Sequence, residues 1–450
     1  MTVEARWPQE LETPTAGFFE AFAAQVAAPD GVRDGVREAV KALIPRIDWE
    51  TYQPHVPHGI LGLRSVLRLR PLLDEANFLR ALATQLHMAA HEGRRSAAAT
   101  AQVAAAKGSG SWRNLEAFIQ ARKPSLAYAE AQGFDLPEAA DFQRLGALVE
   151  ADMANVGHKG IFAWHLGDLH ERLERPRATG RRLFGLVAWL AATQEDTFWC
   201  RRAAKRLEGA EPRVASGSAQ GAAGERDSRE LDAGELEAAV REICDLGLVG
   251  LMAAFTDRLK RGTPAEELLA ALALAAAEKV RDARRDLEGK TAWIFGYLAM
   301  LVETHAEDPR TWAQAAALVN LFPTDEADER MQPRSAAAPS AEGLLNAVLD
   351  AEVPEAMGQA QGLCRLGQAE ATLRTLAAAA TFNDPSFNHA SHLLAVASAA
   401  DLLPALPGQV GEAVLVALAK NLANSQGSGD LGRLADRALA GGRGLRAGTE

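Results

Sequence analysis

Residues 267–280, ELLAALALAAAEKV, decide the fold class of this 450-residue chain. Alanine and leucine dominate the stretch, and both have a high helix propensity. AQVAAAK at 101–107 and TLRTLAAAATF at 372–382 have the same composition, while no segment alternates apolar and polar residues convincingly. Because small side chains also let helices approach closely, we expect an all-α protein, built as a multi-helix bundle or as an array of antiparallel helix pairs.

Two helical regions flank a segment of different composition. Residues 208–230, EGAEPRVASGSAQGAAGERDSRE, combine glycine, serine, alanine and charge with Val214 as the one bulky apolar residue. That composition is typical of a flexible linker or lid. We therefore predict an N-terminal helical half over 16–207 and a C-terminal helical half over 231–440. The two halves are pseudo-similar in length and texture, although no fixed-period repeat aligns them.

Charge and cysteine content restrict the partners and the compartment. The net charge of −11 and the pI near 5.5 argue against nucleic acid or an anionic membrane as partner, because both select positive surfaces. The three cysteines form neither a disulfide framework nor a CxxC pair, which suits a reducing compartment. There is no signal-peptide pattern, and no uncharged apolar stretch reaches the ~18 residues of a membrane span. We expect a cytoplasmic protein.

Ten histidines occur in the chain, and most of them lie inside or beside apolar helical runs. PHVPHGILGL at 54–63, NVGHKGIFAWHLGDLH at 155–170 and FNHASHLLAVASAADLL at 387–403 each place imidazoles next to residues that must be buried. A buried imidazole needs a hydrogen-bond partner or a metal ion. Histidines from distant segments therefore predict a shared metal site, provided that the fold brings them together.

Three of these histidines, His58, His158 and His389, stand at or near predicted helix starts directly before an apolar run. The helix dipole disfavours a positive charge there, so a neutral imidazole that binds a metal explains the choice. A histidine that caps the helix or has a satisfied hydrogen bond in the core explains it equally well. His170, within the charged sequence DLHERLER, is expected on a solvated face.

No sequence pattern selects catalytic acid–base residues. Asp168, Glu303 and Asp384 lie near the candidate ligands in the sequence, but their spacing defines no general base. Trp164 and Trp293 are candidates for the wall of an aromatic-substrate pocket, although most tryptophans serve in the core.

Four segments of the chain resemble the questin oxidase-like proteins. They are PHVPHGILGLRSVLRL (54–69), NVGHKGIFAWHLGDLHERL (155–173), KTAWIFGYLAMLVETH (290–305) and DPSFNHASHLLAVASAADLL (384–403). Members of that family are all-helical, metal-dependent oxygenases associated with aromatic polyketides, and relatives include bacterial helical domains that accompany Rieske modules. The resemblance implies an all-helical oxygenase with a mononuclear non-haem iron as cofactor.

The resemblance also implies which residues hold the iron. The family uses mainly histidines from several helices, and in fungal-type members a modified lysine completes the shell. His58, His158 and His389 match the motif histidines best, with His392, His165 and His305 as secondary candidates. The FNHASHLL segment contains no lysine, and His392 stands where a further ligand is expected. No Rieske module is present either, so a separate protein or the substrate would supply electrons.

The sequence therefore favours a non-haem iron oxygenase that acts on a polycyclic aromatic or polyketide-type substrate by oxygen insertion or ring cleavage. Two alternatives stay open. One is a non-catalytic α-helical scaffold or interaction protein, in which the histidines are ordinary core or surface residues. The other keeps the metal site but uses zinc in a hydrolase or lyase.

Overall fold

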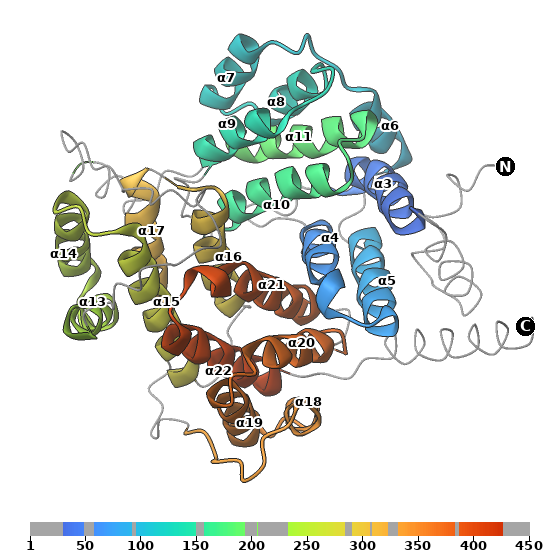
Figure 1. The fold of residues 1–450 in the computed structure, drawn as a ribbon. Helices are drawn as coiled ribbons and strands as arrows, with labels where there is room; N and C mark the ends of the chain where they lie inside the picture. The colour runs from blue at the N-terminus through green and yellow to red at the C-terminus, as the bar shows by residue number, and fades with distance from the viewer. Residues whose placement is uncertain are drawn as a thin grey trace, which may run out of the picture.

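The computed structural model describes residues 30–48, 58–91, 96–149, 157–193, 205, 233–283, 290–306, 308–322, 332–382 and 387–425. Within these ranges there are nineteen α-helices and no strand (Figure 1). The predicted all-α fold class is therefore confirmed. Residues 208–230 lie outside the described residues, so the predicted linker or lid stays a prediction.

The α-helices of the N-terminal part are α3 (Gly31–Leu43), α4 (His58–Leu69), α5 (Glu75–His91), α6 (Ala97–Ala105), α7 (Trp112–Gln120), α8 (Pro124–Ala131), α9 (Ala139–Val149), α10 (His158–Arg172) and α11 (Arg177–Ala192). Those of the C-terminal part are α13 (Ala233–Asp245), α14 (Leu248–Lys260), α15 (Ala265–Asp282), α16 (Lys290–Glu303), α17 (Pro309–Asn320), α18 (Ala341–Leu349), α19 (Val353–Arg365), α20 (Ala369–Ala380), α21 (Phe387–Leu402) and α22 (Gly408–Asn424).

Three of these helices continue directly into a short 3₁₀-helix. These are η2 (Ile44–Arg46), η3 (Arg70–Leu72) and η5 (Leu403–Ala405), which follow α3, α4 and α21. Each has proline as its second residue. Proline lacks the N–H that an α-helix needs and clashes with the preceding turn, so it ends the α-helical hydrogen bonding.

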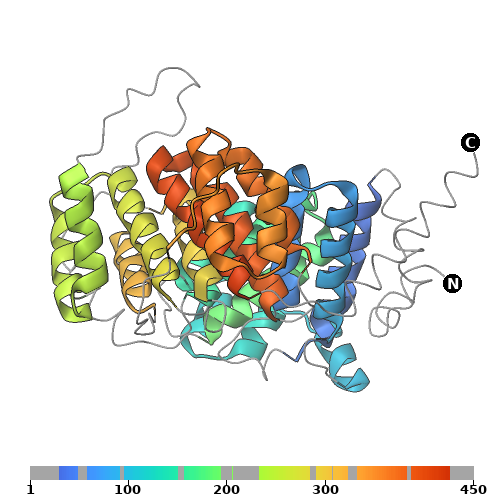
Figure 2. The ribbon, with the colours of Figure 1, turned by 90° about the horizontal axis from the view of Figure 1, so that it is seen from below.

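The centre of the molecule is formed by α4, α10, α16 and α21 (Figure 1). Helix α10 packs on α4 and α16, and α21 packs on the same two helices. Seen from below, α13 and α14 lie at one end of the molecule and the blue N-terminal helices at the other (Figure 2). Apolar residues from both predicted halves belong to one continuous core. The boundaries of the two halves therefore stay a prediction, while their described helices share a core.

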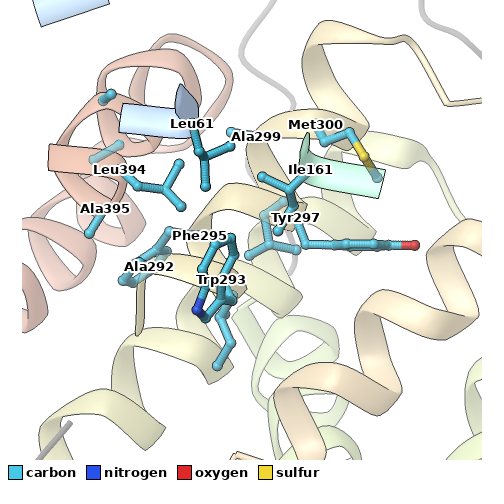
Figure 3. Close-up of a cluster of buried hydrophobic side chains, with 14 of the residues drawn as sticks. Leu61, Ile161, Ala292, Trp293, Phe295, Tyr297, Ala299, Met300, Leu394 and Ala395 are labelled. Carbon is cyan, nitrogen blue, oxygen red and sulfur yellow. The ribbon is translucent and has the colours of Figure 1, made fainter. Parts of the chain in front are cut away.

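The contacts of α16 and α21 show that these two helices run parallel. Leu394 of α21 lies within van der Waals contact of the position that a side chain on Gly296 of α16 would take, as does Ile161 of α10. Seven residues further along each helix, Glu303 lies within electrostatic range of Asp401. Every α-helix rises by about 1.5 Å per residue. Two residues that are each seven positions further along therefore stay near each other only if the two helices run in the same direction. Figure 3 shows the apolar cluster at this level, with Leu61, Ile161, Phe295 and Leu394 among its members.

Helix α4 is held close to α5 by two glycines. A side chain at Gly59 would fall on the backbone of Ala89, and one at Gly62 would fall on the amide of Gln85. At Gly59, where the neighbour is backbone, only a residue without Cβ allows this approach, whereas at Gly62 the Gln85 side chain would have to move. The close helix packing expected from the abundance of small residues is thus present, and it keeps the first turns of α4 in the interior.

A network of ion pairs joins the later turns of α4, α10 and α21. Arg64 is 1% exposed, and it donates to Asp168 at 2.6 Å and to Asp401 at 2.8 Å. Arg68 also pairs with Asp401, and Arg172 pairs with Asp168 at 2.8 Å. Since an unpaired charge in the interior is costly, the buried Arg64 of α4 needs both α10 and α21 in place, and Asp401 of α21 needs α4.

We expect Arg64→Ala to lower the free energy of unfolding by about 2–3 kcal/mol, because it removes the buried cation that Asp168 and Asp401 share and leaves these carboxylates with only the more exposed Arg172 and Arg68. The control is Arg241→Ala, since Arg241 and Glu237 form an exposed pair with 3.8 Å between nitrogen and oxygen. That change should cost less than about 1 kcal/mol. Urea denaturation followed by circular dichroism measures both. Equal losses in the two variants would contradict the role given to Arg64.

Candidate functional site

Two histidines from distant segments meet at the first turns of α4 and α10. The ring centroids of His58 and His158 are 6.1 Å apart, with the ring planes nearly perpendicular at 88°. Trp293 of α16 completes the group: its indole stacks on His158 with a centroid distance of 3.4 Å and meets His58 edge-on at 5.5 Å. His158 and Trp293 are only 4% and 1% exposed. We call these three residues the histidine–tryptophan cluster.

A glycine places His158 in this cluster. Gly157 precedes α10 with φ 74° and ψ 8°, a left-handed conformation that side chains disfavour. A Cβ at Gly157 would also fall on the ring of Tyr297, one turn after Trp293 on α16. Both reasons require glycine at this position. The requirement brings the start of α10 against α16 and presses the His158 ring on the indole.

The indole N–H of Trp293 is a buried donor that has no hydrogen-bond acceptor among the described residues. Leaving such a donor unpaired costs roughly 1–3 kcal/mol, so in the native protein a bound water or a ligand is expected to supply the acceptor. The atom lies beside the two imidazoles that the sequence marked as metal ligands. An oxygen atom of a bound molecule in this place would satisfy it.

The spacing of the two imidazoles is compatible with ligation of one metal ion. Metal–nitrogen bonds of about 2 Å put the centroids of two coordinating rings roughly 4–6 Å apart, depending on the bond angle. The observed 6.1 Å lies at the upper end of that range. A mononuclear site also needs further ligands, because two imidazoles leave most coordination positions open.

His389, the third of the best-matching histidines, opens α21 as its third residue. The parallel register of α16 and α21 sets it level with the first turn of α16, the turn that carries Trp293. Its side chain lies outside the described residues, as does His55 entirely. Among the side chains that are described, no three from His, Cys, Asp and Glu converge in a metal-binding arrangement. The described part therefore contributes two imidazoles of the predicted site.

The structure does not bring the secondary candidates His165 and His392 to this pair. His165 lies seven residues after His158 on α10, which is about 10 Å along a helix, and its ring packs edge-on against Trp164. Burial, reinforced by the charge of Arg64, lowers the pKa of His165 well below its usual value. Burial also lowers the pKa of His392 to about 4. Both imidazoles are therefore neutral at physiological pH.

His392 has its own hydrogen-bond partner at the end of α22. Its Nε2 lies 2.7 Å from Oγ of Ser425, and that hydroxyl donates to the carbonyl of Asn421 at 2.7 Å. Since the single hydroxyl proton is used there, Nε2 of His392 must carry the proton and donate to Ser425. His392 thus has the satisfied core environment that the sequence offered as the alternative to metal binding.

His305 is exposed and lies just after the end of α16, in a left-handed conformation with φ 49°. It lines a surface cleft between α9, α10 and the turn that joins α16 to α17. The cleft has a volume of about 570 Å³ and also contains Trp164, Asp168 and Glu303. The structure therefore gathers several residues that the sequence singled out separately, but at a site distinct from the histidine–tryptophan cluster. We call it the acidic cleft.

The expectation that His170 lies on a solvated face is wrong. His170 has no exposed surface, and its Nε2 lies 3.0 Å from the carbonyl oxygen of Pro137. Burial lowers the pKa of His170, although the Pro137 carbonyl partly opposes this. A side chain on Gly180 would fall on the imidazole ring. The charged neighbours of His170 in the sequence project to other sides of α10, while α9 and α11 cover the imidazole.

Comparisons of the chain with protein-family models, with curated proteins and with solved structures find no match. Within the described ranges, no helix combines the length and the apolar character that crossing a lipid bilayer requires. The interpretation of the site therefore depends on its residues and on the sequence segments quoted above.

The buried neutral histidines predict a loss of stability in acid. Unfolding restores the usual pKa of 6.5 to His392, whereas the folded value is about 4. Between these values the unfolded chain binds a proton that the native protein does not. The free energy of unfolding should therefore be at its full value above pH 6.5 and fall with decreasing pH, by about 1.4 kcal/mol per pH unit for this histidine.

Urea titrations between pH 7 and pH 4 on His392→Gln measure this contribution, because glutamine can donate to Ser425 but does not titrate. The slope of stability against pH should be shallower in this variant than in the unmodified protein. His305→Gln, which changes an exposed imidazole, is the matched control and should keep the original slope. An unchanged slope in His392→Gln would contradict the assignment.

Proposed function

We propose that this protein is a non-haem metal-dependent oxygenase that acts on a polycyclic aromatic or polyketide-type substrate, by oxygen insertion or ring cleavage. The observation that carries the proposal is the meeting of His58 and His158, which lie far apart in the chain, in the interior beside Trp293. The sequence resemblance to the questin oxidase-like proteins names the same two residues as ligands. Iron is the metal that this resemblance favours.

The positions of the two imidazoles support a role as ligands. Both residues are the first of their helices, α4 and α10. The positive end of the helix dipole disfavours an imidazolium there, and burial disfavours it further. Neutral imidazole is the form that binds divalent first-row metals. His389, at the same end of α21, is the expected third ligand.

A bound iron would supply the binding and activation of dioxygen at its open coordination positions. The side chains of the protein would orient the substrate and exclude water. The N–H of Trp293 would donate to a carbonyl or hydroxyl oxygen of the substrate and thereby orient its ring system. Buried apolar residues around the cluster, among them Ile161 and Phe295, would exclude water from the reacting centre. Electrons would come from a separate protein or from the substrate.

Metal analysis of protein purified without an affinity tag tests the proposal. We expect about one iron per chain, and we expect His58→Ala and His158→Ala to lose it, because each removes one of the few protein ligands. His305→Ala is the control: it removes a histidine that also appeared in the predicted ligand set, but one that is exposed and distant from the pair. It should retain the metal.

The other outcomes separate the alternatives. One zinc per chain that depends on the same two histidines would contradict the oxygenase and favour a hydrolase or lyase. Absence of bound metal, together with an unchanged melting temperature in a chelator, would contradict both metal-dependent functions and leave the helical scaffold. Circular dichroism of each variant shows whether a loss of metal reflects a loss of folding, and His58→Gln and His158→Gln provide variants of similar volume.

A further inference from the structure

The acidic cleft is separate from the histidine–tryptophan cluster and has no part in the proposed function. It lies on the side of α10 that carries Gly160, Ala163 and Trp164, whereas His158 faces α16. Its volume of about 570 Å³ is within the usual range for sites that bind small molecules, roughly 300–1,000 Å³. Its lining combines apolar side chains with several carboxylates.

Two aromatic side chains belong to the apolar part of the lining, which otherwise consists of alanines and glycines. Trp164 of α10 and Phe142 of α9 both contribute to it. The guanidinium of Arg64 lies 4.3 Å from the centroid of the Trp164 ring, and His165 meets the same ring edge-on at 4.6 Å. These buried neighbours fix the indole from the protein side. The indole therefore presents a rigid apolar surface to the cleft, suitable for stacking with a flat ring.

The lining is rich in carboxylates, and the titratable His305 is the one basic residue in the described lining. Asp168, Glu171, Glu303 and Asp308 line the cleft, and no lysine or arginine is among its lining residues. Three of these carboxylates have arginine partners: Asp168 pairs with Arg64 and Arg172, Glu171 with Arg175, and Asp308 with Arg310. Glu303 has no ion-pair partner within the described part of the chain. It is the carboxylate that a ligand could neutralise.

Two further observations indicate that carboxylate oxygens in the cleft lack a hydrogen-bond donor or a compensating positive charge. One oxygen of Glu171 is buried and accepts no hydrogen bond, while its other oxygen accepts from Arg175 at 2.8 Å. Partial burial and then the negative charge of Asp401 raise the pKa of Glu303, an effect that Arg64 only partly offsets. A positive group in the cleft would reverse this effect, because it favours the ionised carboxylate.

We propose that the acidic cleft binds a small organic cation with a flat apolar body, such as an aromatic amine or amidine. The ring system lies against Trp164 and Phe142, and the cationic group lies at Glu303. A phenolic polyketide, which carries no positive charge and becomes an anion on ionisation, would be disfavoured by the carboxylates. The ligand of the cleft is therefore chemically distinct from the substrate proposed for the histidine–tryptophan cluster.

Gly146 offers a way to fill the cleft without disturbing the protein. It lies on α9 in the lining, and a Cβ built on it meets no atom within 4 Å. A larger side chain there points into open space, and replacing glycine within a helix does not lower helix propensity. Gly146→Phe should therefore leave the fold intact and occupy the space in which the ligand would lie.

Fluorescence titration of the full chain with proflavine, a flat acridinium cation, tests the proposal, with neutral acridone as the matched probe. We expect proflavine to bind at least about tenfold more tightly than acridone, because a positive group gains from the carboxylates and from the aromatic face. Glu303→Gln keeps the shape of the side chain and should weaken proflavine binding by a similar factor. Gly146→Phe should abolish binding of both probes.

Asp257→Asn is the control for non-specific attraction, since it removes one negative charge from an exposed position on α14, outside the cleft. It should leave the proflavine affinity unchanged. Equal affinity for the two probes, binding that survives Gly146→Phe, or equal weakening by Asp257→Asn and Glu303→Gln would each overturn the proposal. The metal content of Glu303→Gln should equal that of the unmodified protein, so this result is independent of the oxygenase proposal.

Discussion

The guanidinium of Arg64 is the point on which the rest of this structure depends. It is almost completely buried, and it neutralises Asp168 of α10 and Asp401 of α21 at once. It also lies on the face of Trp164. A charge in this position is tolerated only while all of these neighbours stay in place. The arrangement of α4 against α10 and α21 is therefore defined by pairing as well as by apolar packing.

The two ends of the central helices have opposite electrostatic character. Imidazoles lie at the first residues of α4 and α10, where the helix dipole favours neutral or negative groups. Arg68 lies in the last turn of α4, where the dipole favours cations, and Arg64 lies one turn before it. The histidine–tryptophan cluster and the charged network that borders the acidic cleft therefore lie at different levels of α4 and α10.

The surroundings of a side chain could be predicted from the sequence only where residues close to it in the sequence determine them. His58 and His158 were recognisable because each stands immediately before an apolar run, and the structure places them together. The same reasoning was wrong for His170, because its charged neighbours in the sequence say nothing about α9 and α11, which cover it. His392 looked like a ligand but is hydrogen-bonded to Ser425, a residue that no local pattern connects with it. The acidic cleft had no sequence signal, although Trp164, Asp168 and Glu303 had each been noted on its own.

The amino-acid sequence by itself determined that the chain is helical, because helix propensity, small-residue content and the absence of alternating patterns act over a few residues at a time. It also determined which histidines start buried helices. The tertiary structure decided which of them meet, since His58 and His158 are joined only through the packing of α4, α10 and α16. It likewise decided the partners of Arg64, which come from α10 and α21, and the open space beside Gly146. Such contacts depend on the relative orientation of whole helices, and no single segment encodes that orientation.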